Sequence, residues 1–106
     1  MVRTEPQGKT VTQFLKRYSS KNTRRAYRNA LVKFLSFVYD YDDKRAPGQP
    51  PDLEVYDELA LRYIAEDRDR VEDIMEFMAS VSDAPGMSKK GWKSVVVTWL
   101  AACKIF

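Results

Sequence analysis

The residues with the most distinctive chemistry in this sequence are its cations. Seven lysines and arginines lie between positions 16 and 33, and no Asp or Glu occurs from Pro6 to Tyr39. The segment 84–106 is also free of acids, and it contains three closely spaced lysines, Lys89, Lys90 and Lys93. Ammonium and guanidinium groups bind phosphate oxygens through charge-assisted hydrogen bonds. Two acid-free basic segments therefore favour a polyanionic partner, above all a nucleic acid.

The net charge of +3 conceals a strong asymmetry along the 106-residue chain. Residues 1–45 hold 11 Lys+Arg and 4 Asp+Glu, whereas residues 46–83 hold 3 and 11. An acidic block thus separates two basic ones, as a one-sided contact with a polyanion requires. The alternative, that the basic runs are ordinary solvated helix faces, stays open on the sequence alone.

Several kinds of reactive site are missing from the sequence. The chain has no histidine, a single cysteine at Cys103 and four dispersed glycines. These counts exclude His-dependent nucleophilic and metal sites, an internal disulfide and a Gly-rich phosphate loop. We therefore expect no enzymatic activity and no cofactor or metal. One cysteine suits the reducing cytoplasm, and no apolar run approaches the ~20 residues of a membrane span.

Helices must position these cations, because the apolar residues recur at spacings of three and four. We expect an all-α chain: a flexible arm at residues 1–9, then one domain at 10–106 built as a compact orthogonal bundle of four to five helices. A Pro-rich loop should occupy residues 44–52. The expected helices start at Thr10 (about ten residues), at Ser19 (to Tyr41), near Leu53 (a short segment), at Asp67 (to about Ser82) and near Ser88 (to about Lys104).

Each expected helix has an apolar face that should be buried. We expect the second and the last helix to pack against each other through two sets: Tyr27, Leu31 and Phe34 with Trp92, Val96 and Trp99. In the fourth helix the expected buried stripe is Val71, Ile74, Met75, Met78 and Val81, with Glu72, Asp73 and Glu76 exposed. Thr10 is the expected cap of the first helix, and Ser20 or Asn22 that of the second.

The start of the second helix also carries a family resemblance. The residues that carry it are the run Ser20-Lys21-Asn22-Thr23-Arg24-Arg25-Ala26-Tyr27, followed by Leu31, Phe34 and Phe37. This pattern resembles the second helix of the core-binding domain of tyrosine recombinases, the phage-integrase and Xer-type enzymes. The resemblance implies a SAM-like DNA-binding domain whose last helix is the other DNA-facing one. It also implies three partners: double-stranded DNA, a C-terminal catalytic domain and other recombinase protomers on DNA.

The catalytic part of that family is not expected in this chain. Tyrosine recombinases cut DNA with a tyrosine, an arginine pair and an H-x-x-R motif, and the chain has no histidine. None of its six tyrosines is therefore assigned as a nucleophile. We expect the DNA-binding domain of a site-specific recombinase, clamping duplex DNA at the recombination site through two basic helices, with the catalytic domain absent.

The residues expected to contact DNA lie near the starts of two helices. Most should hold phosphates, and Arg28, Asn29 or Ser94 could read base edges. From the second helix they are Lys21, Asn22, Thr23, Arg24, Arg25, Arg28, Asn29 and Lys33, and from the last helix Ser88, Lys89, Lys90, Lys93 and Ser94. The alternative is a helical protein-interaction module whose basic face docks an acidic partner.

Overall fold

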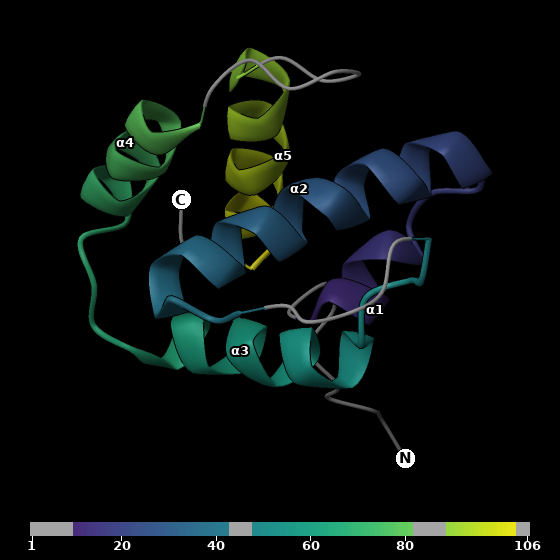
Figure 1. Ribbon diagram of the computed structural model, residues 1–106, viewed down its shortest axis with the longest axis horizontal. Coiled ribbons are helices and arrows are strands. Elements are labelled where there is room, and N and C mark those ends of the chain that lie inside the picture. The colour runs from purple at the N-terminus through teal and green to yellow at the C-terminus, as the bar shows by residue number, and fades with distance from the viewer. Residues whose placement is uncertain (1–9, 43–47, 82–88, 104–106) are drawn as a thin grey trace.

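Five α-helices make up all the regular structure in the residues that the computed structural model describes, 10–42, 48–81 and 89–103. They are α1 (Val11–Leu15), α2 (Lys21–Tyr39), α3 (Leu53–Ala65), α4 (Arg70–Ser80) and α5 (Lys89–Ala102) (Figure 1). The expected all-α class is confirmed. The expected arm at 1–9, residues 44–47 of the Pro-rich loop and Ser88 lie outside the described residues.

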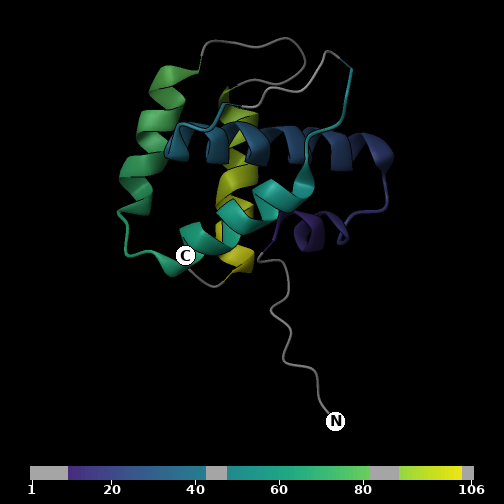
Figure 2. The same ribbon diagram turned by 60° about the horizontal axis from the view of Figure 1, so that its bottom comes forward.

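Helix α2 is the centre of the arrangement. It packs against each of the other four helices. Figures 1 and 2 show it crossing α5, with α4 beside one end and α1 beside the other. Among the described residues, no helix has both the length and the apolar composition needed to cross a bilayer.

Side chains that accept backbone N–H groups fix where four helices begin. Thr10 is the expected cap of α1, and Ser20 is one of the two residues, Ser20 and Asn22, expected as the cap of α2. Helix α1 is shorter than expected, five residues instead of about ten, because its backbone tightens after Leu15 into i→i−3 bonds. Helix α4 begins at Arg70 instead of near Asp67. The caps are Thr10 for α1, Ser20 for α2, Asp52 for α3 and Asp69 for α4.

The core contains the expected faces of α2 and α5. Leu31 and Phe34 of α2 are fully buried in one cluster with Val96 and Trp99 of α5. Tyr27 is only partly buried. Its aromatic partners lie instead in and just after α1, where the ring stacks on Phe14 at 6.2 Å and meets Tyr18 edge-on at 4.8 Å. Tyr27 therefore joins α2 to the α1 segment.

The expected buried stripe of α4 is wrong in part. Val71 and Met75 are 57% and 62% exposed, while Phe77, not placed in that stripe, is buried. The Phe77 ring packs edge-on against Phe34 at 5.3 Å and stacks on Trp92 at 5.9 Å. Burying this large ring rotates the helix, because an aromatic side chain contributes more buried area than valine or methionine at the edge of the same face.

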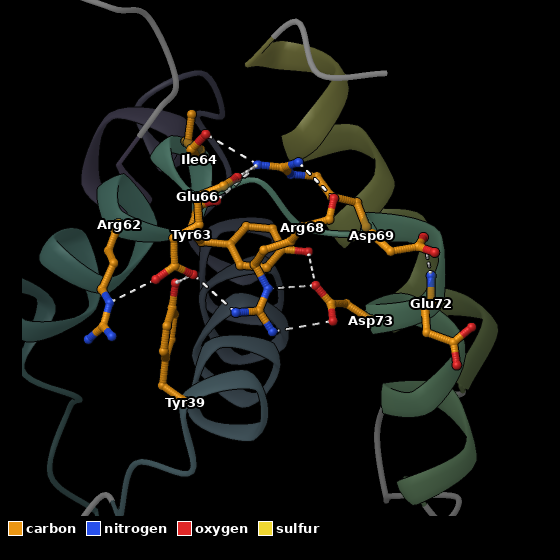
Figure 3. A network of polar contacts seen from close by, with 10 residues as sticks. Tyr39, Arg62, Tyr63, Ile64, Glu66, Arg68, Asp69, Glu72 and Asp73 are labelled. Carbon is orange, nitrogen blue, oxygen red and sulfur yellow. Dashed lines mark hydrogen bonds and ion pairs between the residues drawn. The ribbon is translucent and has the colours of Figure 1, made fainter.

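A network of polar side chains ties the turn between α3 and α4 to the end of α2 (Figure 3). Arg68 is at its centre: Nη1 lies 3.0 Å from Oε1 of Glu66, and Nε lies 2.9 Å from Oδ2 of Asp73. The guanidinium also lies over the rings of Tyr39 and Tyr63, 5.7 and 5.5 Å from their centroids. We call this network the α3–α4 joint; its members are Tyr39, Tyr63, Glu66, Arg68, Arg70 and Asp73.

Two further interactions complete the α3–α4 joint. The Tyr39 hydroxyl donates a hydrogen bond to Glu66 at 2.8 Å, so that α2 is tied to the end of α3. Arg70 Nη2 donates to the backbone carbonyls of Tyr63, Ile64 and Glu66 at 3.0, 3.2 and 2.7 Å. The last carbonyls of a helix have no partner within the helix, so Arg70 caps the C-terminus of α3.

Asp73 is held inside the joint, and the expectation that it faces solvent is wrong. Its side chain is 14% exposed, and it accepts hydrogen bonds from Arg68 and, at 2.9 Å, from the Tyr63 hydroxyl. Burial opposes ionisation, but these hydrogen bonds outweigh it, and the pKa of the Asp73 carboxyl lies below its ordinary value. The acidic block thus contributes to the fold through Asp73.

Candidate nucleic-acid interface

Four of the cations on α2 line one cleft. Their positions, 21, 24, 25 and 28, are three and four residues apart, which places them on one side of the helix. The cleft has a volume of about 460 Å³ and lies between α1, the N-terminal half of α2 and the start of α3. We call it the basic cleft. It is lined by Thr12, Leu15, Lys16, Lys21, Arg24, Arg25, Arg28 and Leu53, and no acid is among these residues.

A single carboxylate positions the α1 wall of the basic cleft. Asp57 of α3 accepts hydrogen bonds from the backbone N–H of Thr12 at 2.9 Å and from its hydroxyl at 2.6 Å. These contacts hold the first turn of α1 against α3. Lys16 and Leu15 follow directly in the chain and reach the cleft from there. Because its carboxylate is occupied by Thr12, Asp57 supports the cleft without adding an acid to its lining.

The charges on the first turns of α2 are unfavourable for the helix itself. The first turn contains no acid, and the positive end of the helix dipole repels the cations there. Lys21 with Arg25, and Arg24 with Arg28, are like-charged pairs four residues apart, and each such pair costs roughly 0.2–0.5 kcal/mol. A bound anion would relieve both effects. The cations on α2 should therefore be more stable with a negatively charged ligand bound in the cleft than without one.

The remaining expected residues of α2 do not line the basic cleft. Asn22, Asn29 and Lys33 are exposed, on a strip about 100° around the helix axis from the cleft. The backbone N–H of Thr23 is 3.3 Å from the Ser20 hydroxyl, which makes Thr23 part of the helix cap. Asn29 and Lys33 remain available to a ligand that extends beyond the cleft.

No described residue of α5 lines the basic cleft either. Lys93 and Ser94 are exposed. Lys89 and Lys90 belong to the first turn of α5, but their side chains, like the whole of Ser88, lie outside what the structure describes. In both views α5 passes behind α2, while α1 lies beside the N-terminal half of α2 (Figures 1 and 2). The adjacency of the two basic helix starts thus stays a prediction.

Sequence reasoning missed half of the lining residues of the basic cleft. The acid-free run of cations was the signal that found the α2 side. Nothing local predicts that α1 and the start of α3 form the opposite walls, because the Asp57–Thr12 contact joins residues 45 positions apart. The missed residues are Thr12, Leu15, Lys16 and Leu53.

Comparison with protein-family models, curated proteins and solved structures found no match to this chain. The function of the basic cleft is therefore argued from its own geometry and from the sequence of α2.

Proposed function

We propose that this chain is a DNA-binding domain that holds duplex DNA by its phosphates. The observation that carries the proposal is the convergence of five cations, one from the α1 segment and four from α2, on a cleft with no acid among its described lining residues. Arginine binds phosphate oxygens in pairs through its planar fork, and lysine binds them as a point charge. Such contacts set the position of the domain on DNA without reading its sequence.

The exposed strip of α2 and the lysines of α5 extend this contact in our proposal. Asn29, Lys33, Lys93 and Ser94 are exposed and lie on the two helices that were expected to face DNA. Polar side chains at such positions supply the few base contacts that a phosphate-bound domain needs for selectivity. The duplex would then lie across α2 and reach the start of α5.

The family resemblance supports a role for this DNA-binding domain in site-specific recombination. The start of α2 resembles the core-binding domain of tyrosine recombinases, and five helices agree with the SAM-like bundle that the resemblance implies. On this proposal the domain clamps one side of a recombination site, a catalytic domain clamps the other, and further protomers bind the same DNA. The chain itself carries no cutting activity, since the family's H-x-x-R motif needs a histidine and the sequence has none.

Salt dependence of binding to an intact duplex tests the proposal. If about five phosphates are neutralised, log affinity should fall against log salt with a slope of about −4 to −5. Arg25→Ala and Lys93→Ala should each flatten the slope by about one unit. Arg62→Ala is the matched control, because Arg62 is 64% exposed on α3 and does not line the basic cleft.

The alternative of an acidic protein partner makes a different prediction in the same titration. A poly-glutamate peptide would then displace the duplex at equal charge concentration, and the dependence on salt would be shallower than phosphate release gives. Absence of duplex binding at low salt, or unchanged binding by Arg25→Ala and Lys93→Ala, would refute DNA binding through these helices.

A further inference from the structure

The shape of the basic cleft is unusual for a surface that meets only a double helix. A helix that reads duplex DNA projects into the major groove, about 12 Å wide, and carries its contacts on a convex ridge. Here four of the eight expected α2 contacts line a hollow instead. Its volume of about 460 Å³ is that of a small-ligand site. A hollow of this size accommodates a nucleotide or two of one strand, whereas a double helix can present only backbone phosphates to the exposed cations at its edge.

The lining of the cleft matches the chemistry of one strand. Its five cations suit a ligand that carries a negative charge on every unit, as a phosphodiester chain does. The lining also includes two apolar side chains, the largely buried Leu15 and the half-buried Leu53, and the latter offers contact to sugars and bases. Inorganic phosphate would make no use of these leucines. No aromatic ring is among the described lining residues, so bases gain no stacking platform here and the contact depends on phosphates and sugars, which carry no sequence information.

We propose that the basic cleft receives a single unpaired strand, and that the domain prefers DNA with a short single-stranded segment over intact duplex. This inference rests on the proposed function, since it concerns the same DNA and the same cations. It also assigns the paired and the unpaired parts of the DNA to parts of the α2 surface. The exposed cations of the cleft and the exposed strip of α2, with Asn29 and Lys33, hold the phosphates of the paired part of the DNA, and the cleft itself also receives the strand where pairing is interrupted.

Fluorescence anisotropy with three labelled DNAs tests the inference: an intact duplex, the same duplex with a short single-stranded gap, and the unpaired strand alone. The gapped duplex should bind about five- to tenfold more tightly than the intact one, a difference that one or two added phosphate contacts supply. For the unpaired strand, log affinity should fall with log salt with a slope nearer −0.7 than −0.9 per phosphate contacted.

Two variants of the same helix assign the preference to the cleft. Arg25→Ala, which removes an exposed cation from the lining, should abolish most of the preference for the gapped duplex. Lys33→Ala, which removes an exposed cation of α2 outside the cleft, should weaken both duplexes alike and leave the preference unchanged. Circular dichroism and melting of both proteins verify that each is folded.

The possible outcomes separate this inference from the proposed function. Equal affinity for gapped and intact duplex, with Arg25→Ala weakening both alike, would overturn the inference and leave duplex binding intact. Binding of the unpaired strand without binding of duplex would support the inference and overturn the proposed function. Binding of none of the three DNAs at low salt would overturn both.

Discussion

Removing Arg68 should destabilise the domain strongly, although it lies in an acidic, partly exposed turn. Its guanidinium forms two ion pairs, with Glu66 and Asp73, and lies over two tyrosine rings. An exposed ion pair contributes about 0–1 kcal/mol and breaking a buried one costs about 3–5 kcal/mol. The Asp73 side chain is only 14% exposed, so Arg68→Ala should cost an intermediate amount, about 1–3 kcal/mol.

Thermal unfolding followed by circular dichroism measures this loss. For a domain of this size, 1 kcal/mol lowers Tm by roughly 4–8 °C, so Arg68→Ala should melt about 4–24 °C below the parent. Arg62→Ala is the control: Arg62 also pairs with Glu66 and lies over the Tyr39 ring at 4.8 Å, but it is 64% exposed and does not contact Asp73, so its loss should cost less, about 0.5–1 kcal/mol. If Arg68→Ala melted together with Arg62→Ala, the α3–α4 joint would not stabilise the fold as argued.

The same loss should depend on pH. The folded state lowers the pKa of Asp73 and of Glu66, so their contribution is complete above the unfolded values of about 4 and disappears as pH falls through the lower folded values. The difference in Tm between the parent and Arg68→Ala should therefore be full at pH 6 and above. It should shrink below about pH 4. A difference that stayed constant down to pH 2 would contradict the ion-pair explanation.

Three further results are expected. Asp57→Ala should lower the free energy of unfolding in urea by about 1–3 kcal/mol, because two hydrogen bonds to Thr12 are lost and α1 is too short to persist alone. Glu58→Ala should be nearly neutral, and equal effects of the two substitutions would show that Asp57 does not anchor α1. Trp99→Ala should cost about 3–5 kcal/mol and unfold much of the protein at 25 °C, whereas survival with a normal Tm would mean that the α5 face is misplaced. The free energy of unfolding should also decline as pH rises from 10 toward 12, because burial and the hydrogen bond to Glu66 raise the pKa of the Tyr39 phenol to about 12 in the folded state. A Tm that stayed constant between pH 10 and 12 would contradict this.

The sequence predicted the features that depend on helical periodicity. The apolar spacing in α2 and α5 identified Leu31, Phe34, Val96 and Trp99, all buried, and local capping chemistry narrowed the cap of α2 to Ser20 or Asn22, of which Ser20 is the cap. These predictions succeed because each uses neighbours within one or two turns. Periodicity alone also supports an all-α class, since a helical repeat excludes strands in the same residues.

Predictions failed where two overlapping helical faces were equally apolar. In α4 the spacing admits a stripe through Val71 and Met75 as well as one through Ile74 and Phe77. Contact of Phe77 with rings from α2 and α5 decides between them, and that contact is not visible in a local window. Arg68 shows the same limit. By sequence it is a cation in an acidic block, and only the fold shows that Asp73 is its partner.

The position of α2 has a consequence for how ligand binding and folding are coupled. The helix touches all four others, and its first turns carry most of the cations of the basic cleft. A DNA strand bound in the basic cleft therefore contacts α2, the helix whose unfolding would remove the packing partner of every other helix. Any ligand that binds only the folded state stabilises it by RT ln(1 + [L]/Kd), about 2.7 kcal/mol at one hundred times Kd. Occupancy of the cleft should thus be transmitted to α4, at the far end of α2, as slower exchange of its backbone amide hydrogens with solvent.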